Sequence, residues 1–134
     1  MARGYDTADF KRRLRKLPKV MRRELSAALE KDADEWVKVS KMLAPRDPED
    51  GTPLADSILR HGTETGGQVV RAGGETTTKP SAGGPFDYAV GQEFGTQNGP
   101  RQPFFWPAYR LLRKKFTSRR RRALSKAIKE ISDG

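Results

Sequence analysis

The sequence predicts an α+β fold in which two long helices pack on a small, mostly antiparallel sheet, with mobile loops. Near both ends of the chain, apolar residues recur three and four positions apart, as is typical of amphipathic helices. The middle is rich in Gly, Pro and Thr and contains short apolar runs that are typical of strands. The chain has 134 residues, the size of one domain, so we expect residues 1–134 to form a single domain.

The N-terminal helical pattern is interrupted by Pro18. Asp6 or Thr7 can cap a short helix within residues 1–17, because either side chain can accept a hydrogen bond from a free backbone N–H. Proline suits the first turn of a helix, so we expect a second helix to begin at Pro18 and to end before Pro45. The apolar face of this second helix, with Asp32 as its one polar member, comprises Met21, Leu25, Ala28, Leu29, Trp36, Val39 and Leu43.

The middle of the chain is expected to form short elements joined by turns. Residues 54–60 fit either one helical turn or the start of a strand, and residues 62–67 fit a turn. The best strand candidate is the segment 68–72, where β-branched residues are bounded by glycines. We expect a flexible loop or a hairpin arm over residues 74–86. Residues 88–94 fit a strand or a helix, because seven residues are too few for periodicity to decide.

A long C-terminal helix is predicted to begin near Phe105, with Pro107 in its first turn. Arginines occupy positions 119–122 and therefore point in all directions around this helix. At least one of them must lie beside the apolar stripe and extend its charged group to water or to a partner carboxylate. The stripe comprises Phe105, Tyr109, Leu112, Phe116, Ala123, Ala127 and Ile131.

Charge is unevenly distributed along the chain, whose net charge is +10. Residues 1–23 carry nine Lys and Arg against two Asp and Glu, and residues 94–134 carry eleven against two. Residues 24–93 carry seven against thirteen, so two basic ends flank an acidic middle. Identical subunits could join a basic end to an acidic middle in head-to-tail contacts, which close into a ring when the rotation allows.

The composition argues against several kinds of chemistry. The absence of cysteine excludes disulfides, thiolate metal sites and a cysteine nucleophile. His61, the single histidine, has no metal-ligand spacing around it, and a turn or surface position is expected. Asp47, Glu49 and Asp50 could hold a cation, but a solvated loop is the simpler interpretation. We expect no enzyme activity, no cofactor and no metal, and the apolar runs are too short to span a membrane.

The basic face of the C-terminal helix has two interpretations. Its side chains could neutralise the phosphates of a nucleic acid, or they could meet an acidic protein surface. Docking to protein is favoured, because the nearby aromatic residues fall on the helical stripe or between prolines and because the chain carries its own acidic middle. The predicted basic face comprises Arg110, Arg113, Lys114, Arg119, Arg120, Arg121 and Arg122.

The most informative stretch lies between Tyr88 and Ala108, where three adjacent aromatic residues stand between two prolines in a hydrophilic chain. The prolines stiffen the backbone, so less entropy is lost on burial, and large aromatic residues are preferred interface anchors. Packing of the helix start against the sheet is the alternative, and it suits Phe105 and Trp106 better than Phe104. The predicted interface comprises Glu93, Phe94, Gly95, Thr96, Gln102, Pro103, Phe104, Phe105 and Trp106.

Two residues before the aromatic run have specific expected roles. Glu93 is the last acid before the basic helix, and we expect it to pair with an arginine or to bond the loop backbone. Gly95 allows a sharp chain reversal after Phe94.

The stretch from Tyr88 to Ala108 resembles the tail-completion, or head–tail joining (neck), family of long-tailed bacteriophages and gene transfer agents. Two earlier motifs, Leu43-Ala44-Pro45 and Leu54-Ala55-Asp56-Ser57-Ile58, are similar to motifs of that family, so the resemblance covers residues 18–130. The loop over residues 46–53 is longer than the family's compact loop, and residues 74–86 match no feature of the family.

The resemblance implies a structural protein of the virion neck, present in the host cytoplasm during assembly. Such proteins form a ring, commonly of six subunits, at the head-proximal end of the tail. They terminate the tail tube and join it to the head connector. The implied partners are further copies of the chain, the major tail tube protein and the head connector or stopper protein, and DNA passes through the lumen without sequence-specific binding. The alternatives are a head-closure or minor capsid protein of the same neck, or a small basic nucleic-acid-binding protein.

Overall fold

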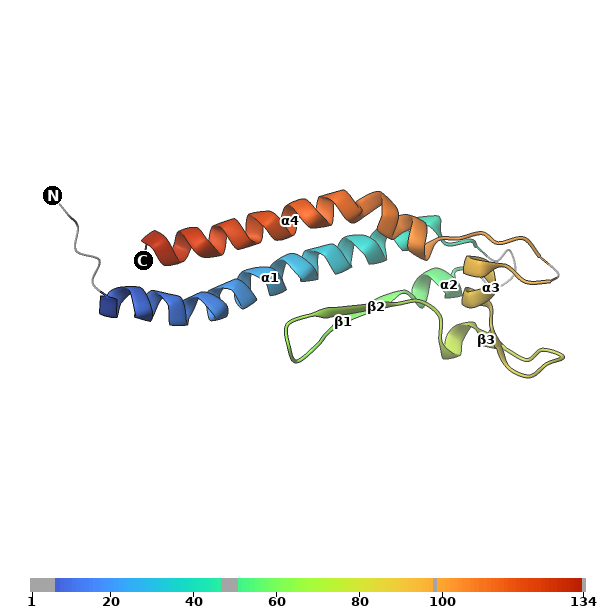
Figure 1. Ribbon diagram of the computed structural model, residues 1–134. Helices are drawn as coiled ribbons and strands as arrows, with labels where there is room; N and C mark the ends of the chain where they lie inside the picture. The colour runs from blue at the N-terminus through green and yellow to red at the C-terminus, as the bar shows by residue number, and fades with distance from the viewer. Residues whose placement is uncertain (1–6, 47–50, 98, 134) are drawn as a thin grey trace.

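The computed structural model of the protein describes residues 7–46, 51–97 and 99–133. The α+β class is confirmed, with two long helices side by side and short strands along and beyond the first of them (Figure 1). In chain order the elements are α1 (Thr7–Leu43), α2 (Pro53–Asp56), β1 (Leu59–Gly62), β2 (Gln68–Arg71), the 3₁₀ helix η1 (Glu75–Thr77), β3 (Thr78–Lys79), β4 (Phe86–Asp87), α3 (Tyr88–Phe94) and α4 (Phe105–Asp133).

The helix α1 is continuous over 37 residues, so the prediction of a second helix beginning at Pro18 is wrong. A proline inside a helix removes one backbone hydrogen bond and crowds the preceding turn. Contacts with α4 hold α1 on both sides of this point. Arg13 donates a hydrogen bond of 2.7 Å to the carbonyl of Ser132, and Arg23 pairs with Glu130. Packing against α4 therefore outweighs the local cost of the proline.

The helices α1 and α4 form an antiparallel hairpin, with both described chain ends at the same tip (Figure 1). The buried residues of α4 are small except for one aromatic side chain, which lets the two helix axes approach closely. The buried members of the predicted stripe are Phe116, Ala123 and Ala127, joined by Ala108, which the prediction omitted. Within the described residues, none of the helices has the length and apolar content needed to cross a membrane.

The strands form two separate two-stranded antiparallel sheets and not one larger sheet. The predicted strand is confirmed as β2, which pairs with β1 across a turn closed by a 3.0 Å hydrogen bond from the Thr63 N–H to the Gly67 carbonyl. Residues 54–60 combine the two alternatives, since α2 is followed directly by β1. Arg60 connects this hairpin to α1 through ion pairs with Glu30 at 3.2 Å and Asp34 at 2.6 Å.

Residues 74–86 form η1 and most of a second hairpin, β3–β4, so the expected hairpin arm is confirmed. Asp87 organises this region by accepting hydrogen bonds from the Gly74 N–H, the Thr77 hydroxyl and the Ala89 N–H. Burial alone would raise the pKa of Asp87, but these three bonds outweigh it, and the pKa is lowered. Gly73 has φ of +89°, and a Cβ there would lie 2.5 Å from the Asp87 carboxylate, so only glycine fits.

The main apolar core lies at one end of the hairpin, where α1 ends and α4 begins. It is built from Ala44, Leu54, Ile58, Ala89 and Phe104. These residues come from α2, α3 and the segments that follow α1, follow α2 and precede α4, so the core gathers all the sequence motifs in one place. The predicted cap Asp6 and the acidic cluster of Asp47, Glu49 and Asp50 lie outside the described residues.

Candidate assembly interface

Glu93 holds the start of α4 with its carboxylate. Its Oε2 accepts hydrogen bonds from the backbone N–H groups of Phe104 at 2.9 Å and Phe105 at 3.0 Å, and its Oε1 accepts one from Trp106 at 3.0 Å. Backbone N–H groups in the first turn of a helix have no partner within the helix, and they carry a partial positive charge that favours an anion. The expectation that Glu93 bonds the loop backbone is therefore confirmed.

We call these three bonds the Glu93 clamp, and we call the stretch from Tyr88 to Ala108 the motif. The clamp explains several residues of the motif. Pro107 has no N–H, so Glu93 and the proline together leave none of the donors at positions 104–107 unpaired. Gly95 ends α3 with φ of +85°, and the chain turns back there, confirming the expected reversal. The Gln102 N–H then bonds the carbonyl of Gln92 at 2.7 Å, which brings the two halves of the motif together.

Trp36 of α1 anchors the aromatic residues of the motif. Its ring lies 4.6 Å from that of Phe105, 5.0 Å from that of Tyr109 and 5.6 Å from that of Trp106, measured between centroids. Its indole N–H donates a 2.8 Å hydrogen bond to the carbonyl of Phe105. The sequence placed Trp36 on the apolar face of its helix, but nothing in the sequence identified it as the partner of this carbonyl.

Two residues of the predicted interface are interior residues of the subunit. Phe104 is 1% exposed and belongs to the main core, so the preference for Phe104 as an interface residue is corrected. Its N–H is held by the Glu93 carboxylate, and its ring belongs to the same apolar cluster as Leu54 and Ile58. Glu93 is also buried, with its carboxylate occupied by the three backbone bonds.

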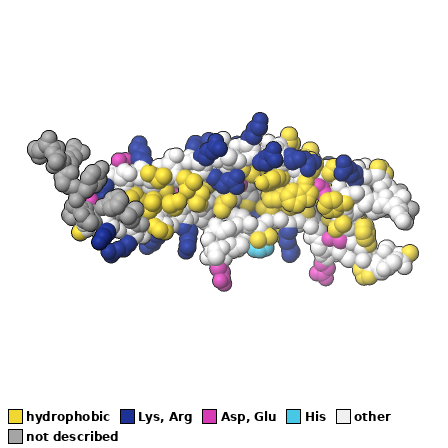
Figure 2. All heavy atoms as spheres, viewed as in Figure 1, with side chains coloured by type: hydrophobic (Ala, Val, Ile, Leu, Met, Phe, Trp, Pro, Cys, Tyr) yellow, Lys and Arg dark blue, Asp and Glu magenta, His cyan; other side chains and the backbone are white. Residues whose placement is uncertain are grey.

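Several large apolar side chains at the same end remain exposed, and three of them lie in the stretch from Tyr88 to Ala108: Val90 at 52%, Phe94 at 65% and Trp106 at 43%. Val90 and Phe94 lie one turn apart on α3, and Trp106 lies in the first turn of α4. Glu93 of α3 connects the two helices by accepting a hydrogen bond from the Trp106 N–H. We call these three residues the apolar end. Figure 2 shows hydrophobic side chains gathered where α4 begins, with lysines and arginines along its outer side. Thr96 and Gln102 are also exposed, and Pro103 is half-buried.

Arg119 departs from the basic face. It lies between α4 and α1, where it pairs with Asp32 and Glu35. Asp32 and Arg119, which interrupt the apolar faces of α1 and α4, therefore pair with each other. This agrees with the expectation that one arginine of the run 119–122 reaches a partner carboxylate. Burial raises the pKa of Asp32 in spite of Arg119, whereas bonds from Lys115 and Arg119 outweigh burial at Glu35 and lower its pKa. The other predicted basic residues, Arg110, Arg113, Lys114, Arg120, Arg121 and Arg122, are all exposed.

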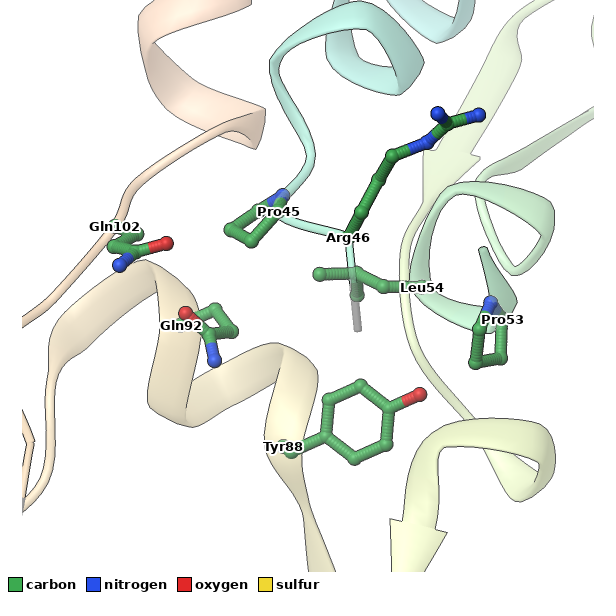
Figure 3. Close-up of a pocket in the computed structure, with 7 residues that line it drawn as sticks. All are labelled: Pro45, Arg46, Pro53, Leu54, Tyr88, Gln92 and Gln102. Atoms are coloured by element: carbon green, nitrogen blue, oxygen red, sulfur yellow. The ribbon is translucent and has the colours of Figure 1, made fainter. Parts of the chain in front are cut away.

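A pocket of about 460 Å³ opens at the same end of the molecule (Figure 3). Its polar groups are two amides, one guanidinium and one phenol, which can donate and accept hydrogen bonds. Among the described residues, its lining includes no carboxylate or imidazole for acid–base chemistry. The pocket is lined by Pro45, Arg46, Pro53, Leu54, Tyr88, Gln92 and Gln102.

The described residues hold no group of three or more His, Asp or Glu side chains placed to bind a metal ion. His61 is exposed on β1, opposite Val69. At the stretch from Tyr88 to Ala108 the structure presents backbone held by Glu93 and aromatic rings packed on Trp36.

A family described as "Bacteriophage HK97-gp10, putative tail-component" matches residues 8–95. This span covers α1 through α3 and includes Glu93, while the aromatic run and α4 lie beyond it. No significant match was found among curated proteins or among solved structures. The matched span is more than half of the chain and agrees with the resemblance of the motifs, so the chain belongs to the HK97-gp10-like family of bacteriophage tail components.

Proposed function

We propose that this protein is a subunit of a ring at the head-proximal end of the tail, where it terminates the tail tube and joins it to the head connector. Membership of a family of phage tail components supports a structural role in the virion. Under this proposal the protein acts by assembly and catalyses no reaction, and it waits in the host cytoplasm until assembly.

The apolar end carries the proposal. Exposed aromatic side chains are costly for a free subunit and favourable in an interface, where they are the commonest anchors. The Glu93 clamp and the Trp36 stack fix Trp106 before any partner arrives, so little conformational freedom is lost on binding. The proposed partners are further copies of the chain in a ring of six, the major tail tube protein and the head connector protein.

Electron microscopy tests the proposal. Purified protein mixed with polymerised tail tubes is expected to add a ring at one end of each tube and to stop further growth. Tubes that grow to the same lengths with and without the protein, and that show no added density at either end, would contradict it.

A further inference from the structure

The acidic middle of the chain is largely used within the subunit. Of its thirteen acidic residues, three lie at positions 47–50 and outside the described residues. Most of the others already hold a cation or a backbone N–H, which leaves few carboxylates to receive the basic end of a neighbour. The engaged residues are Glu24, Glu30, Asp32, Asp34, Glu35, Asp87 and Glu93.

The excess of positive charge gathers at the end of the helical hairpin that lies away from the core. We call this end the basic arm and define it as residues 7–23 of α1 and 120–133 of α4. The ion pair between Arg23 and Glu130 and the bond from Arg13 to the Ser132 carbonyl show that the two segments lie side by side. Figure 2 shows lysines and arginines standing out from this end.

The basic arm carries thirteen Lys and Arg residues and three acidic residues. Twelve of these cations are exposed, and nine of the twelve form no ion pair with a carboxylate of the described residues. The nine are Lys11, Arg15, Lys16, Lys19, Arg22, Arg120, Arg121, Arg122 and Lys129. A cluster of this size repels itself, so it costs stability unless a polyanion neutralises it.

Charge density identifies the class of polyanion. The α1 segment of the arm has 17 residues and spans about 25 Å. Double-stranded DNA carries one charge per ~1.7 Å, which is about 15 phosphates over the same length. The nine exposed cations of the arm that are in no ion pair could neutralise more than half of these phosphates. Protein surfaces intersperse both signs of charge, so an acidic protein face is a poorer match.

We propose that the basic arm binds double-stranded DNA through its phosphates, without sequence preference. The proposal does not depend on ring formation, because a single subunit presents the complete arm. The apolar end and the arm lie at opposite ends of the hairpin, so a subunit held by the apolar end leaves its arm free for DNA.

Fluorescence anisotropy with a labelled 30-base-pair duplex of arbitrary sequence tests the proposal. The full chain is expected to bind at 50 mM NaCl and to lose affinity at least about a hundredfold by 200 mM. In the triple variant Lys16→Gln, Lys19→Gln, Arg121→Gln, the slope of log affinity against log salt is expected to fall by about 3, since each lost phosphate contact removes about 0.9.

The matched control is the triple variant Lys38→Gln, Lys41→Gln, Arg71→Gln, which removes the same charge from exposed positions outside the arm. It is expected to bind the duplex within about twofold of the unchanged chain, with helix content equal to that of the arm variant by circular dichroism. Three results would overturn the proposal: no binding at 50 mM NaCl, equal weakening in both triple variants, or binding of polyglutamate as tight as that of the duplex.

Discussion

The two ends of the α1–α4 hairpin are held by different forces. At the apolar end, α4 is fixed by backbone bonds to Glu93 and by rings stacked on Trp36, beside the main core. At the basic arm, the helices are joined by small buried residues such as Ala127 and by exposed ion pairs such as Arg23–Glu130. Surface ion pairs contribute little and weaken with salt. The difference indicates that the apolar end is a rigid surface, whereas the stability of the basic arm depends more on the salt around it.

The largest expected difference between the ends comes from truncating one apolar side chain in each. Phe104→Ala removes a fully buried ring from the core and is expected to lower the free energy of unfolding by about 4 kcal/mol. Ile128→Ala, at a half-exposed position of the arm, is expected to change it by less than about 0.5 kcal/mol. Urea denaturation measures both, and equal losses would refute the idea that the core lies at one end.

The Glu93 clamp is tested by Glu93→Ala, which leaves three backbone N–H groups without a partner. The expected loss is roughly 3 kcal/mol, because each buried donor left unpaired costs about 1 kcal/mol or more. Glu64→Ala, at an exposed position in the β1–β2 turn, is the control and is expected to be nearly neutral. A loss below 1 kcal/mol in Glu93→Ala, measured by thermal unfolding, would show that water replaces the clamp.

Unfolding measured over a range of pH tests the contribution of the Asp87 carboxylate, which holds η1 and the β3–β4 hairpin near the apolar end. The pKa of Asp87 is lowered on folding, so its ionised form stabilises the native state above about pH 4, and this contribution is lost as the pH falls through the folded value. Asp87→Asn is expected to cost about 1 kcal/mol at pH 7, because the amide nitrogen of Asn cannot accept the hydrogen bond that the Gly74 N–H donates to Asp87, and less at pH 3. A difference that stays constant from pH 6 to pH 3 would contradict this assignment.

The smallest expected effect is at the arm. Glu130→Gln breaks the exposed pair with Arg23 and is expected to lower the free energy of unfolding only slightly at low salt. The cost should vanish near 1 M NaCl, where screening is nearly complete. Chemical denaturation at two salt concentrations checks it, and a salt-independent loss would mean that Glu130 acts through packing.

The sequence predicted the helices, the strand β2 and the meeting of one arginine with the apolar stripe, because these follow from local spacing. It failed at Pro18, since the packing of α4 on both sides of the proline is a long-range effect. It also placed Phe104 in an interface, because a sequence does not show which of three adjacent rings a distant carboxylate turns inward. The sequence showed Asp32 as the one polar residue on the apolar face of its helix, but its pairing with Arg119 depends on the register of the two helices.

If, as we propose, the apolar end joins this subunit to the phage tail, then removing its aromatic rings should prevent the subunit from joining. The most direct measurement compares the double variant Phe94→Gln, Trp106→Gln with Ile128→Gln, a control with one exposed apolar residue changed at the other end. Both are mixed with polymerised tail tubes and the capped ends are counted by electron microscopy. We predict that the control caps tubes like the unchanged chain and that the double variant, though folded, does not. Capping by the double variant at the level of the control would contradict the account.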